Sequence, residues 1–288
     1  MHSAYVGRFA PSPTGPLHFG SLLAAVASFV QARANNGRWL VRIEDIDPPR
    51  EVPGAARAQL ATLRHFGLIP DRPPSLQSRA AGRHRTAIAG LLQHGLAFHC
   101  ACSRADLEAD GRYPGTCRNG LPAGRAARAI RLRVPAAPVE FTDRLFGPQR
   151  YALAEQCGDF VIRRADGCIA YQLAVVIDDL AAGVSEVVRG VDLLDSTPRQ
   201  IAVCRALGRR PPAWLHLPLA VDRHGRKLSK SAADDPVIRL SAPRTLARVL
   251  QALGHRPPAG MRSLASLLNW AVAVWNVEQI PREPFEVG

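Results

Sequence analysis

The 288-residue chain lacks the hydrophobic segments that membrane and exported proteins carry. It contains no run of about 18 consecutive apolar residues, the length that a membrane-spanning helix needs. Residues 1–4 show neither the basic nor the apolar region of a secretory signal peptide. Internal repeats and low-complexity linkers are missing as well. These absences argue against membrane association and predict a cytoplasmic protein.

The composition is that of an ordinary globular protein, with 47% hydrophobic and 21% charged residues. A chain of this length can form one large domain or two modest ones. Its 37 Lys and Arg residues exceed its 24 Asp and Glu residues, which gives a formal net charge of +13. Such an excess attracts polyanions, of which nucleic acid is the commonest, although genomic base content can produce the same bias. The charge therefore supports an RNA partner without identifying one.

Residues 8–21 match neither of the two common phosphate-binding patterns, GxGxxG and GxxxxGK[ST]. They read instead as a strand end, a proline-rich loop and a helix start. Residues 5–9 are typical of a strand, and the apolar positions after Gly20 recur with helical spacing. The Asn-Asn-Gly segment at 35–37 ends that helix, and residues 39–43 form a second strand. This βαβ unit places the loop at the crevice beyond the carboxyl ends of the strands.

The loop has the groups that bind an anion. Its backbone amides and the amino terminus of the following helix offer hydrogen-bond donors, and His18 adds an imidazole. On these grounds alone a plain connecting loop is the commoner outcome.

Two signatures in the right order resemble those of class I aminoacyl-tRNA synthetases. Residues 18–21 read HFGS and resemble the HIGH motif in its glutamate form, and residues 227–231 read KLSKS and resemble the KMSKS motif. A basic surface turn is the alternative for the second motif, but the presence of both argues against it. The resemblance implies ATP binding with Mg²⁺, catalytic roles for His18 and Lys230, and further ATP contacts from Gly20 and Lys227.

A third segment points to the amino-acid substrate. Residues 42–50 read RIEDIDPPR at the end of the second strand, where carboxylates can hold an ammonium group, although an acidic capping turn is an equal alternative. The string resembles glutamyl-tRNA synthetases, in which the residue matching Glu44 receives the substrate's amino group. Arg8 would then pair with a substrate carboxylate. Taken together, the glutamate contacts implied by the resemblance are Arg8, Ala10, Ser12, Glu44, Tyr171 and Arg189.

Three of the six cysteines lie close together in the sequence, at positions 100, 102 and 117. Zinc takes four ligands, so these thiols leave one place for Tyr113, His99 or a water, and three reduced, buried thiols are the alternative. A compact relative of glutamyl-tRNA synthetase carries a structural zinc on a Cys-x-Cys, Tyr, x3-Cys pattern. That resemblance implies a zinc site made of Cys100, Cys102, Tyr113 and Cys117. The other cysteines, at 157, 168 and 204, are predicted to lie in the core.

The predicted fold is α/β, with a doubly wound parallel (Rossmann-type) core like that of class I synthetases. We expect residues 1–98 to form the first half of the core, 99–158 a zinc-binding insertion, 159–240 the second half with the KLSKS loop, and 241–288 a small helical cap. The predicted helices cover residues 54–66, 79–93, 197–207, 243–253 and 263–275. Further strands are predicted at residues 129–134 and 185–189.

The resemblance covers nearly the whole chain, but too few residues follow the KLSKS segment to form the anticodon-reading domain of full-length glutamyl-tRNA synthetases. It therefore implies the compact relative, which activates glutamate with ATP and transfers it to the queuosine base of tRNA(Asp). The expected partners are tRNA(Asp) bearing queuosine, ATP and L-glutamate, in a monomer. The alternatives are a truncated glutamyl-tRNA synthetase charging tRNA(Glu), an RNA-independent nucleotidyltransferase of the same fold, and a catalytically silent RNA-binding module.

Overall fold

The computed structural model describes residues 4–226 and 237–287 and has a parallel sheet at its centre. Its strands are β1 (Val6–Phe9), β2 (Arg38–Ile43), β3 (Ser75–Leu76), β9 (Glu186–Gly190) and β10 (Ala213–Leu217). The pairs β1–β2, β2–β3 and β9–β10 are parallel, and the Ser185 amide donates to the Val6 carbonyl at 2.9 Å, which places β9 beside β1. The order β3-β2-β1-β9-β10 runs outward from β1 in both directions. This order confirms the predicted doubly wound parallel core.

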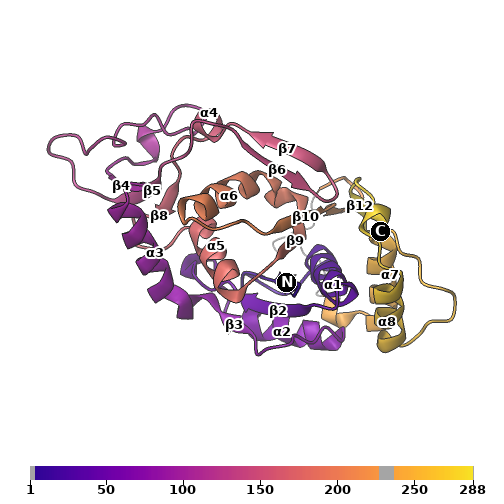
Figure 1. Cartoon of the computed structure of the whole chain (residues 1–288). Coiled ribbons are helices and arrows are strands. Elements are labelled where there is room, and N and C mark those ends of the chain that lie inside the picture. Colours follow the sequence, from indigo (N-terminus) through magenta and orange to yellow (C-terminus); the bar gives the residue numbers. More distant parts are fainter. Residues whose placement is uncertain (1–3, 227–236, 288) are drawn as a thin grey trace.

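Helices cover both faces of this sheet (Figure 1). One face packs against α1 (Phe19–Ala34), α7 (Ala242–Ala252) and α8 (Leu264–Val274), and the other against α3 (Ala81–Gln93), α5 (Tyr171–Ala182) and α6 (Thr197–Ala206). Successive residues of β9 pack into hydrophobic cores on opposite faces of the sheet. Val188 packs with the α1, α7 and α8 side, and Val187 packs with the α3, α5 and α6 side. Strands that are buried on both faces usually read as continuous apolar runs. Residues 185–189 depart from this pattern, because only Val187 and Val188 are apolar and the flanking Glu186 and Arg189 are buried as well.

Most predicted elements are confirmed within one or two residues. Helix α1 begins at Phe19 and is followed by Asn36, whose φ of 51° ends it in the predicted Asn-Asn-Gly segment. Helix α2 (Ala55–His65) and helices α6, α7 and α8 match their predicted ranges. Helix α3 begins later than predicted because residues Gln77–Ala80 form a 3₁₀ turn first. The predicted strand at 129–134 is shorter, as β5 (Ala129–Leu132).

The segment between the two halves of the core forms a second sheet and a hairpin. Strands β4 (Ala97–Cys100), β5 and β8 (Val161–Arg163) make an antiparallel sheet, with the short helix α4 (Leu153–Gln156) nearby. Strands β6 (Val139–Asp143) and β7 (Gly147–Tyr151) form a hairpin, and β6 pairs in parallel with core strand β10. The predicted boundary at 98/99 falls inside β4, and the four-part division stays a prediction.

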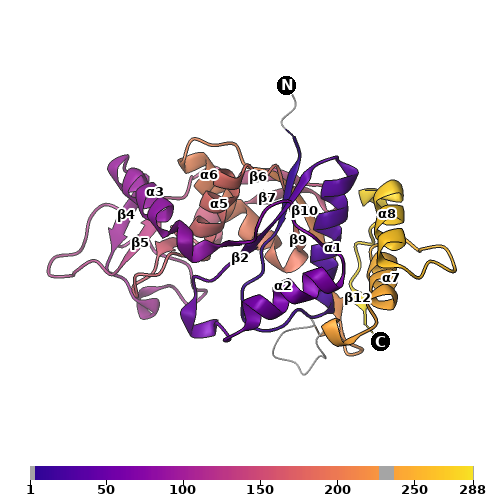
Figure 2. The ribbon, with the colours of Figure 1, turned by 90° about the horizontal axis from the view of Figure 1, so that it is seen from below.

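The end of the chain packs against strand β11 (Ala220–Val221) and the first turn of α1. Strand β12 (Phe285–Glu286) pairs with β11, and the Phe285 ring stacks on Phe19 at 5.8 Å between centroids. Helices α7 and α8 lie at the opposite end of the molecule from β4 and β5, in both views (Figures 1 and 2). Across residues 4–226 and 237–287, we find no helix with the length and apolarity that a bilayer crossing requires.

Two glycines that follow helices allow a matched test of backbone strain. Gly208 follows α6 with a φ of 65° and open space around it, and Gly254 follows α7 with a φ of 82°. A Cβ at Gly254 would overlap the backbone oxygen of Gln279. We expect Gly208→Ala to lower the free energy of unfolding by about 1 kcal/mol, from left-handed strain alone. Gly254→Ala should cost about 2 kcal/mol more because of the overlap. Urea denaturation would measure both, and equal losses would contradict this geometry.

Candidate functional site

A cavity of about 210 Å³ opens at the carboxyl ends of the central strands. Residues at or just after the ends of β1, β2, β9 and β10 line it, together with the first turn of α1. Ligands of doubly wound sheets bind in this crevice. The predicted site residues found in its lining are Arg8, Ala10, His18, Gly20, Glu44, Tyr171 and Arg189.

The remaining predicted residues are not in that lining. Ser12 is absent from it, and its backbone carbonyl accepts a hydrogen bond from the Gln59 amide at 3.0 Å. Lys227 and Lys230 fall outside the described residues.

His18 lies at the amino terminus of α1. It is the N-cap residue, and its Nδ1 accepts a hydrogen bond from the Ser21 backbone amide at 3.4 Å. The other ring nitrogen, Nε2, lies 2.9 Å from the Ser21 hydroxyl. Gly20 faces the ring closely, because a Cβ there would lie 3.2 Å from an imidazole carbon of His18. The positive dipole end of a helix favours phosphate groups at such a position.

Two arginines and two carboxylates form a balanced network on one side of the cavity. Asp179 on α5 accepts from Arg8 Nε at 3.2 Å and from Arg42 at 2.7 Å. Arg42 also donates to Glu44 at 3.1 Å. Burial raises the pKa of Asp179, but the charges of Arg42 and Arg8 outweigh it, so this pKa lies below its usual value. Asp179 contacts Arg8 at Nε, and within residues 4–226 and 237–287 we find no hydrogen bond from its terminal nitrogens, which could therefore meet a ligand.

Glu44 shows the opposite balance. Burial raises its pKa, and the positive charges of Arg42 and Arg8 reduce this shift without cancelling it. An ammonium group that arrives beside Glu44 would stabilise the ionised carboxylate.

Arg189, at the other side of the cavity, has a different environment. Each of its N–H groups has an acceptor: Nε donates to His216 Nε2 at 3.1 Å, and the terminal nitrogens donate to Gln200, Tyr171, Thr197 and the Leu193 carbonyl. All of these acceptors are neutral. Within the described part of the chain no carboxylate forms an ion pair with Arg189, which is 5% exposed. Burial accordingly lowers its pKa.

Tyr171 completes this side of the cavity. Its hydroxyl accepts from Arg189 at 3.4 Å, the longest of the Arg189 hydrogen bonds, and burial raises its pKa. An incoming carboxylate can replace this weak contact as the acceptor for Arg189, and it can also accept a hydrogen bond from the Tyr171 hydroxyl.

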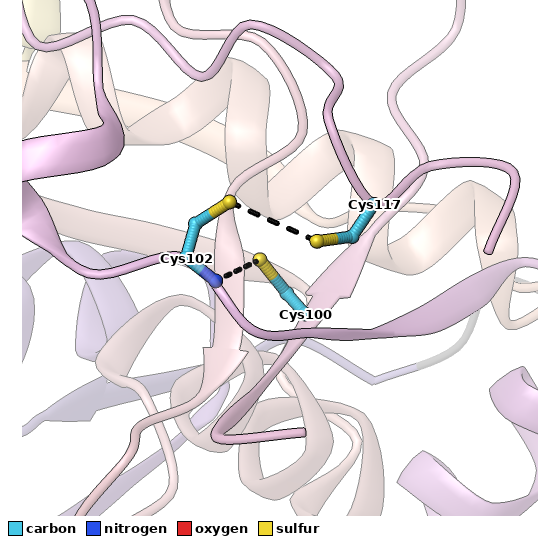
Figure 3. Close-up of side chains that lie close together, drawn as sticks. All are labelled: Cys100, Cys102 and Cys117. Atoms are coloured by element: carbon cyan, nitrogen blue, oxygen red, sulfur yellow. Dashed lines mark hydrogen bonds between the residues drawn. The ribbon is translucent and has the colours of Figure 1, made fainter. Parts of the chain in front are cut away.

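The three clustered cysteines come together next to the antiparallel sheet, with their sulfur atoms pointing toward one another (Figure 3). All three sulfurs lie within 4.8 Å of one another and are buried, and Cys102 Sγ lies 3.7 Å from Cys117 Sγ. The Tyr113 hydroxyl lies 3.8 Å from Cys100 Sγ and accepts from the Cys117 amide at 2.7 Å. The cluster could therefore bind a metal ion.

The electrostatics of this cluster differ between its thiols. Burial raises the pKa of Cys100, but hydrogen bonds from the Cys102 amide and Arg131 outweigh it and leave this pKa below its usual value. Burial and the neighbouring thiols raise the pKa of Cys102 to about 11. His99, a candidate fourth ligand, is exposed between the buried Phe98 and Cys100 on β4. No histidine or carboxylate of the described residues joins the group.

The other cysteines only partly follow the prediction. Cys204 is buried in the core as expected, but Cys157 and Cys168 are partly exposed. Cys157, just after α4, still packs against the core, whereas Cys168 lies in a turn and joins none of the buried clusters of the described residues, so the prediction was wrong for Cys168.

Several functional residues escaped prediction from the sequence. Asp179 and Arg42 organise the cavity, and His216 and Asp143 stand behind Arg189. The double aspartate at 178–179 inside an apolar run was the one signal available, because a charge buried in a core helix needs a partner.

Residues 5–239 match the protein family described as "tRNA synthetases class I (E and Q), catalytic domain". A glutamyl-Q tRNA(Asp) synthetase from Aromatoleum aromaticum is 51% identical over 97% of this chain and 91% of its own length. Proteins of the same name from Chromobacterium violaceum and Pseudomonas aeruginosa are 49% and 51% identical, and the alignments cover 97% or more of each chain.

Solved structures show the same architecture. A glutamate tRNA ligase from Elizabethkingia meningosepticum, crystallised with its amino acid, superposes with a TM-score of 0.84 over 99% of this chain and 67% of the ligase. The two sequences are 23% identical, so this likeness concerns the fold alone.

The Asp179 network predicts a pH-dependent stability. Asp179→Asn leaves Arg8 and Arg42 without their shared carboxylate, so we expect the free energy of unfolding to fall by about 3–5 kcal/mol at neutral pH. Because the folded pKa of Asp179 lies below the ordinary pKa of an aspartate, its contribution is full above that ordinary value and is lost as the pH falls through the folded pKa. The difference between wild type and variant in thermal unfolding should therefore shrink as the pH is lowered below the ordinary pKa of an aspartate.

The matched control is Asp166→Asn, which removes an exposed carboxylate paired with Arg164. We expect this variant to change the melting temperature little at any pH. A deficit for Asp179→Asn that is the same at pH 3 and pH 7 would contradict the assignment.

Proposed function

The chain belongs to the class I tRNA synthetases of the glutamate and glutamine type, among the glutamyl-Q tRNA(Asp) synthetases, and we propose that it activates glutamate with ATP and transfers it to the queuosine base of tRNA(Asp). The resemblance predicted from the HFGS and KLSKS segments is thereby confirmed. The acceptor follows the names of relatives that align along nearly their whole length.

The observation that carries the choice of glutamate is the buried charge of Arg189. Arg8 and Arg42 are balanced by Asp179 and Glu44, whereas the acceptors of Arg189 are neutral. A buried guanidinium that forms no ion pair within the described residues favours a ligand that brings a carboxylate, and it disfavours the neutral amide of glutamine. This arrangement supports an acidic amino acid as the substrate.

The opposite end of the substrate fits the balanced side of the cavity. Glu44 can hold the amino group, and the terminal nitrogens of Arg8 can hold a carboxylate as a planar fork. Ala10 supplies a short side chain in the lining, and Tyr171 adds a hydroxyl. Ser12 stays in the proposed site by family likeness alone.

The reaction follows from these positions. A glutamate carboxylate oxygen attacks the α-phosphorus of ATP, the bond to the β-phosphate breaks, and glutamyl-adenylate and pyrophosphate form. An RNA hydroxyl then attacks the activated carbonyl and releases AMP. We propose that His18 and the α1 amino terminus at Gly20 bind the phosphates, that Lys227 adds a contact to ATP, that Lys230 neutralises the pyrophosphate charge as it develops, and that Mg²⁺ accompanies ATP.

Two alternatives share the activation step. A truncated glutamyl-tRNA synthetase would charge tRNA(Glu), and a nucleotidyltransferase of the same fold would use a small acceptor. The net charge of +13 favours an RNA acceptor over a small one. We propose a cytoplasmic monomer.

The proposed function is tested by transfer of labelled glutamate, with ATP, to purified tRNA(Asp) with and without queuosine, beside tRNA(Glu). We expect label only on tRNA(Asp) that carries queuosine. Label on tRNA(Glu) would show a truncated synthetase instead. If no RNA is labelled, glutamate-dependent ATP–pyrophosphate exchange separates the small-acceptor enzyme, which exchanges, from a silent binding protein, which does not.

We also propose that the cluster of Cys100, Cys102, Cys117 and Tyr113 holds a structural zinc ion. Two sulfur ligands of a tetrahedral zinc lie about 3.8 Å apart, since each Zn–S bond is about 2.3 Å. The 3.7 Å between Cys102 and Cys117 fits this edge, and the 3.8 Å between the Tyr113 hydroxyl and Cys100 Sγ supports Tyr113 as the fourth ligand. Bound zinc would crosslink the loop after β4 to residues 113–117.

The zinc proposal predicts about one zinc per chain by elemental analysis of protein purified without chelator. Cys102→Ser should lose most of this zinc and lower the melting temperature. Cys168→Ser is the matched control, because Cys168 lies outside the cluster. This variant should keep its bound zinc and the wild-type melting temperature. Zinc-free wild-type protein of unchanged stability would contradict the proposal.

A further inference from the structure

Behind Arg189 lies a buried pair that does not line the cavity. His216 on β10 and Asp143 at the end of β6 are 0% and 1% exposed. Asp143 Oδ2 lies 2.6 Å from His216 Nδ1 and also accepts the His216 backbone amide at 3.0 Å. Its other oxygen accepts the amides of Leu145 and Phe146 at 3.0 and 2.9 Å. A continuous chain of hydrogen bonds thus runs from the inserted hairpin to the cavity.

The hydrogen bonds determine which nitrogen of His216 carries the proton. Arginine can only donate, so the 3.1 Å bond from Arg189 Nε requires a lone pair on His216 Nε2. The proton therefore sits on Nδ1 and points at Asp143, whose four accepted hydrogen bonds fit an ionised carboxylate. Burial lowers the pKa of His216, and burial of Asp143 is outweighed by the His216 hydrogen bond, so the pKa of Asp143 is also low. The pair is a neutral imidazole held by an anion.

This arrangement fixes Arg189 without neutralising it. A carboxylate in contact with the guanidinium would satisfy its charge and compete with a substrate carboxylate. The imidazole instead supplies a neutral acceptor, and it keeps the anion one residue further away. Thr197 shares the task, because its hydroxyl lies 3.1 Å from His216 Nε2 and accepts from Arg189 at 2.8 Å.

We propose that Asp143 and His216 are positioning residues that set the affinity for a carboxylate at Arg189 and thereby the choice of glutamate over glutamine. Asp143 selects the imidazole tautomer, and His216 holds the guanidinium plane against the cavity. The inference rests on the proposed function in taking the ligand to be glutamate. It also gives the inserted hairpin a part in amino-acid selection, since β6 supplies Asp143.

The test is Asp143→Asn, measured by ATP–pyrophosphate exchange in the presence of tRNA(Asp). If the asparagine keeps its oxygen on the Leu145 and Phe146 amides, its NH₂ group faces His216 Nδ1. The imidazole proton then moves to Nε2. The Nε2–H group of His216 would face the Nε–H group of Arg189, and the hydrogen bond between them would be lost. We expect the KM for glutamate to rise about 10- to 100-fold, the loss typical of one buried charge-assisted hydrogen bond. The KM for ATP should stay within about twofold, and the preference for glutamate over glutamine should fall about tenfold or more.

A matched control separates positioning from general damage. Glu186→Gln changes another buried carboxylate on the same strand as Arg189, one that bonds Tyr5, Gln31 and Arg144 and does not line the cavity. It should lower thermal stability and leave the KM for glutamate within about twofold. Equal rises in both variants, or an unchanged glutamate KM in a folded Asp143→Asn protein, would overturn the proposal.

A second measurement needs no catalysis. The ¹⁵N chemical shifts of histidine-labelled protein report which imidazole nitrogen carries the proton, and the signal missing from His216→Gln identifies His216. We expect a protonated Nδ1 in the wild type and a protonated Nε2 in Asp143→Asn. A protonated Nε2 in the wild type would refute the assigned geometry. Wild-type protein with the expected tautomer but no glutamate-dependent exchange would instead count against the proposed function, so the two failures are distinguishable.

Discussion

The carboxylate of Asp179 is the interaction on which the cavity depends. It lies on a helix of one half of the core and holds two arginines from strands of the other half, Arg8 and Arg42. Without it, the positive charges of Arg8 and Arg42 would lose their shared carboxylate, at a cost that is a large fraction of the free energy of unfolding of a typical domain. Asp179 and Glu44 pair with these two arginines, whereas Arg189 forms no ion pair within the described residues.

The two sides of the cavity handle charge in different ways. On the Asp179 side, ion pairs are already formed before any ligand arrives, which makes that side rigid. On the Arg189 side, hydrogen bonds fix the geometry while the charge stays available for a ligand. A preorganised but electrostatically unsatisfied group binds its ligand without having to break an existing ion pair first. Among the hydrogen bonds of Arg189, the one to Tyr171 is the longest, at 3.4 Å. A ligand carboxylate would therefore replace this hydrogen bond most easily.

Much of the fold could be predicted because its signals are local. Helix periodicity, Gly stops and buried apolar strands depend on neighbouring residues, and they placed α1, α2, α6 and β9 within a residue or two. The site was partly predictable, since most of the predicted contacts line one cavity. What the sequence could not supply is pairing across long distances. Asp143 and His216 are 73 residues apart, and Arg42 and Asp179 are 137 apart. Neither pair leaves a periodic or spaced pattern.

The pairing of β6 with β10 has a consequence for the modularity of this enzyme family. By sequence, residues 99–158 look like a cassette inserted between two halves of a core. In space, Asp143, the last residue of β6, contacts His216 behind the cavity residue Arg189, and His216 belongs to core strand β10. Transplanting the cassette into a related scaffold would carry one half of that pair and leave the other behind. In a chimera cut at these boundaries, the residue at position 143 and the residue at position 216 would therefore come from two different parent proteins.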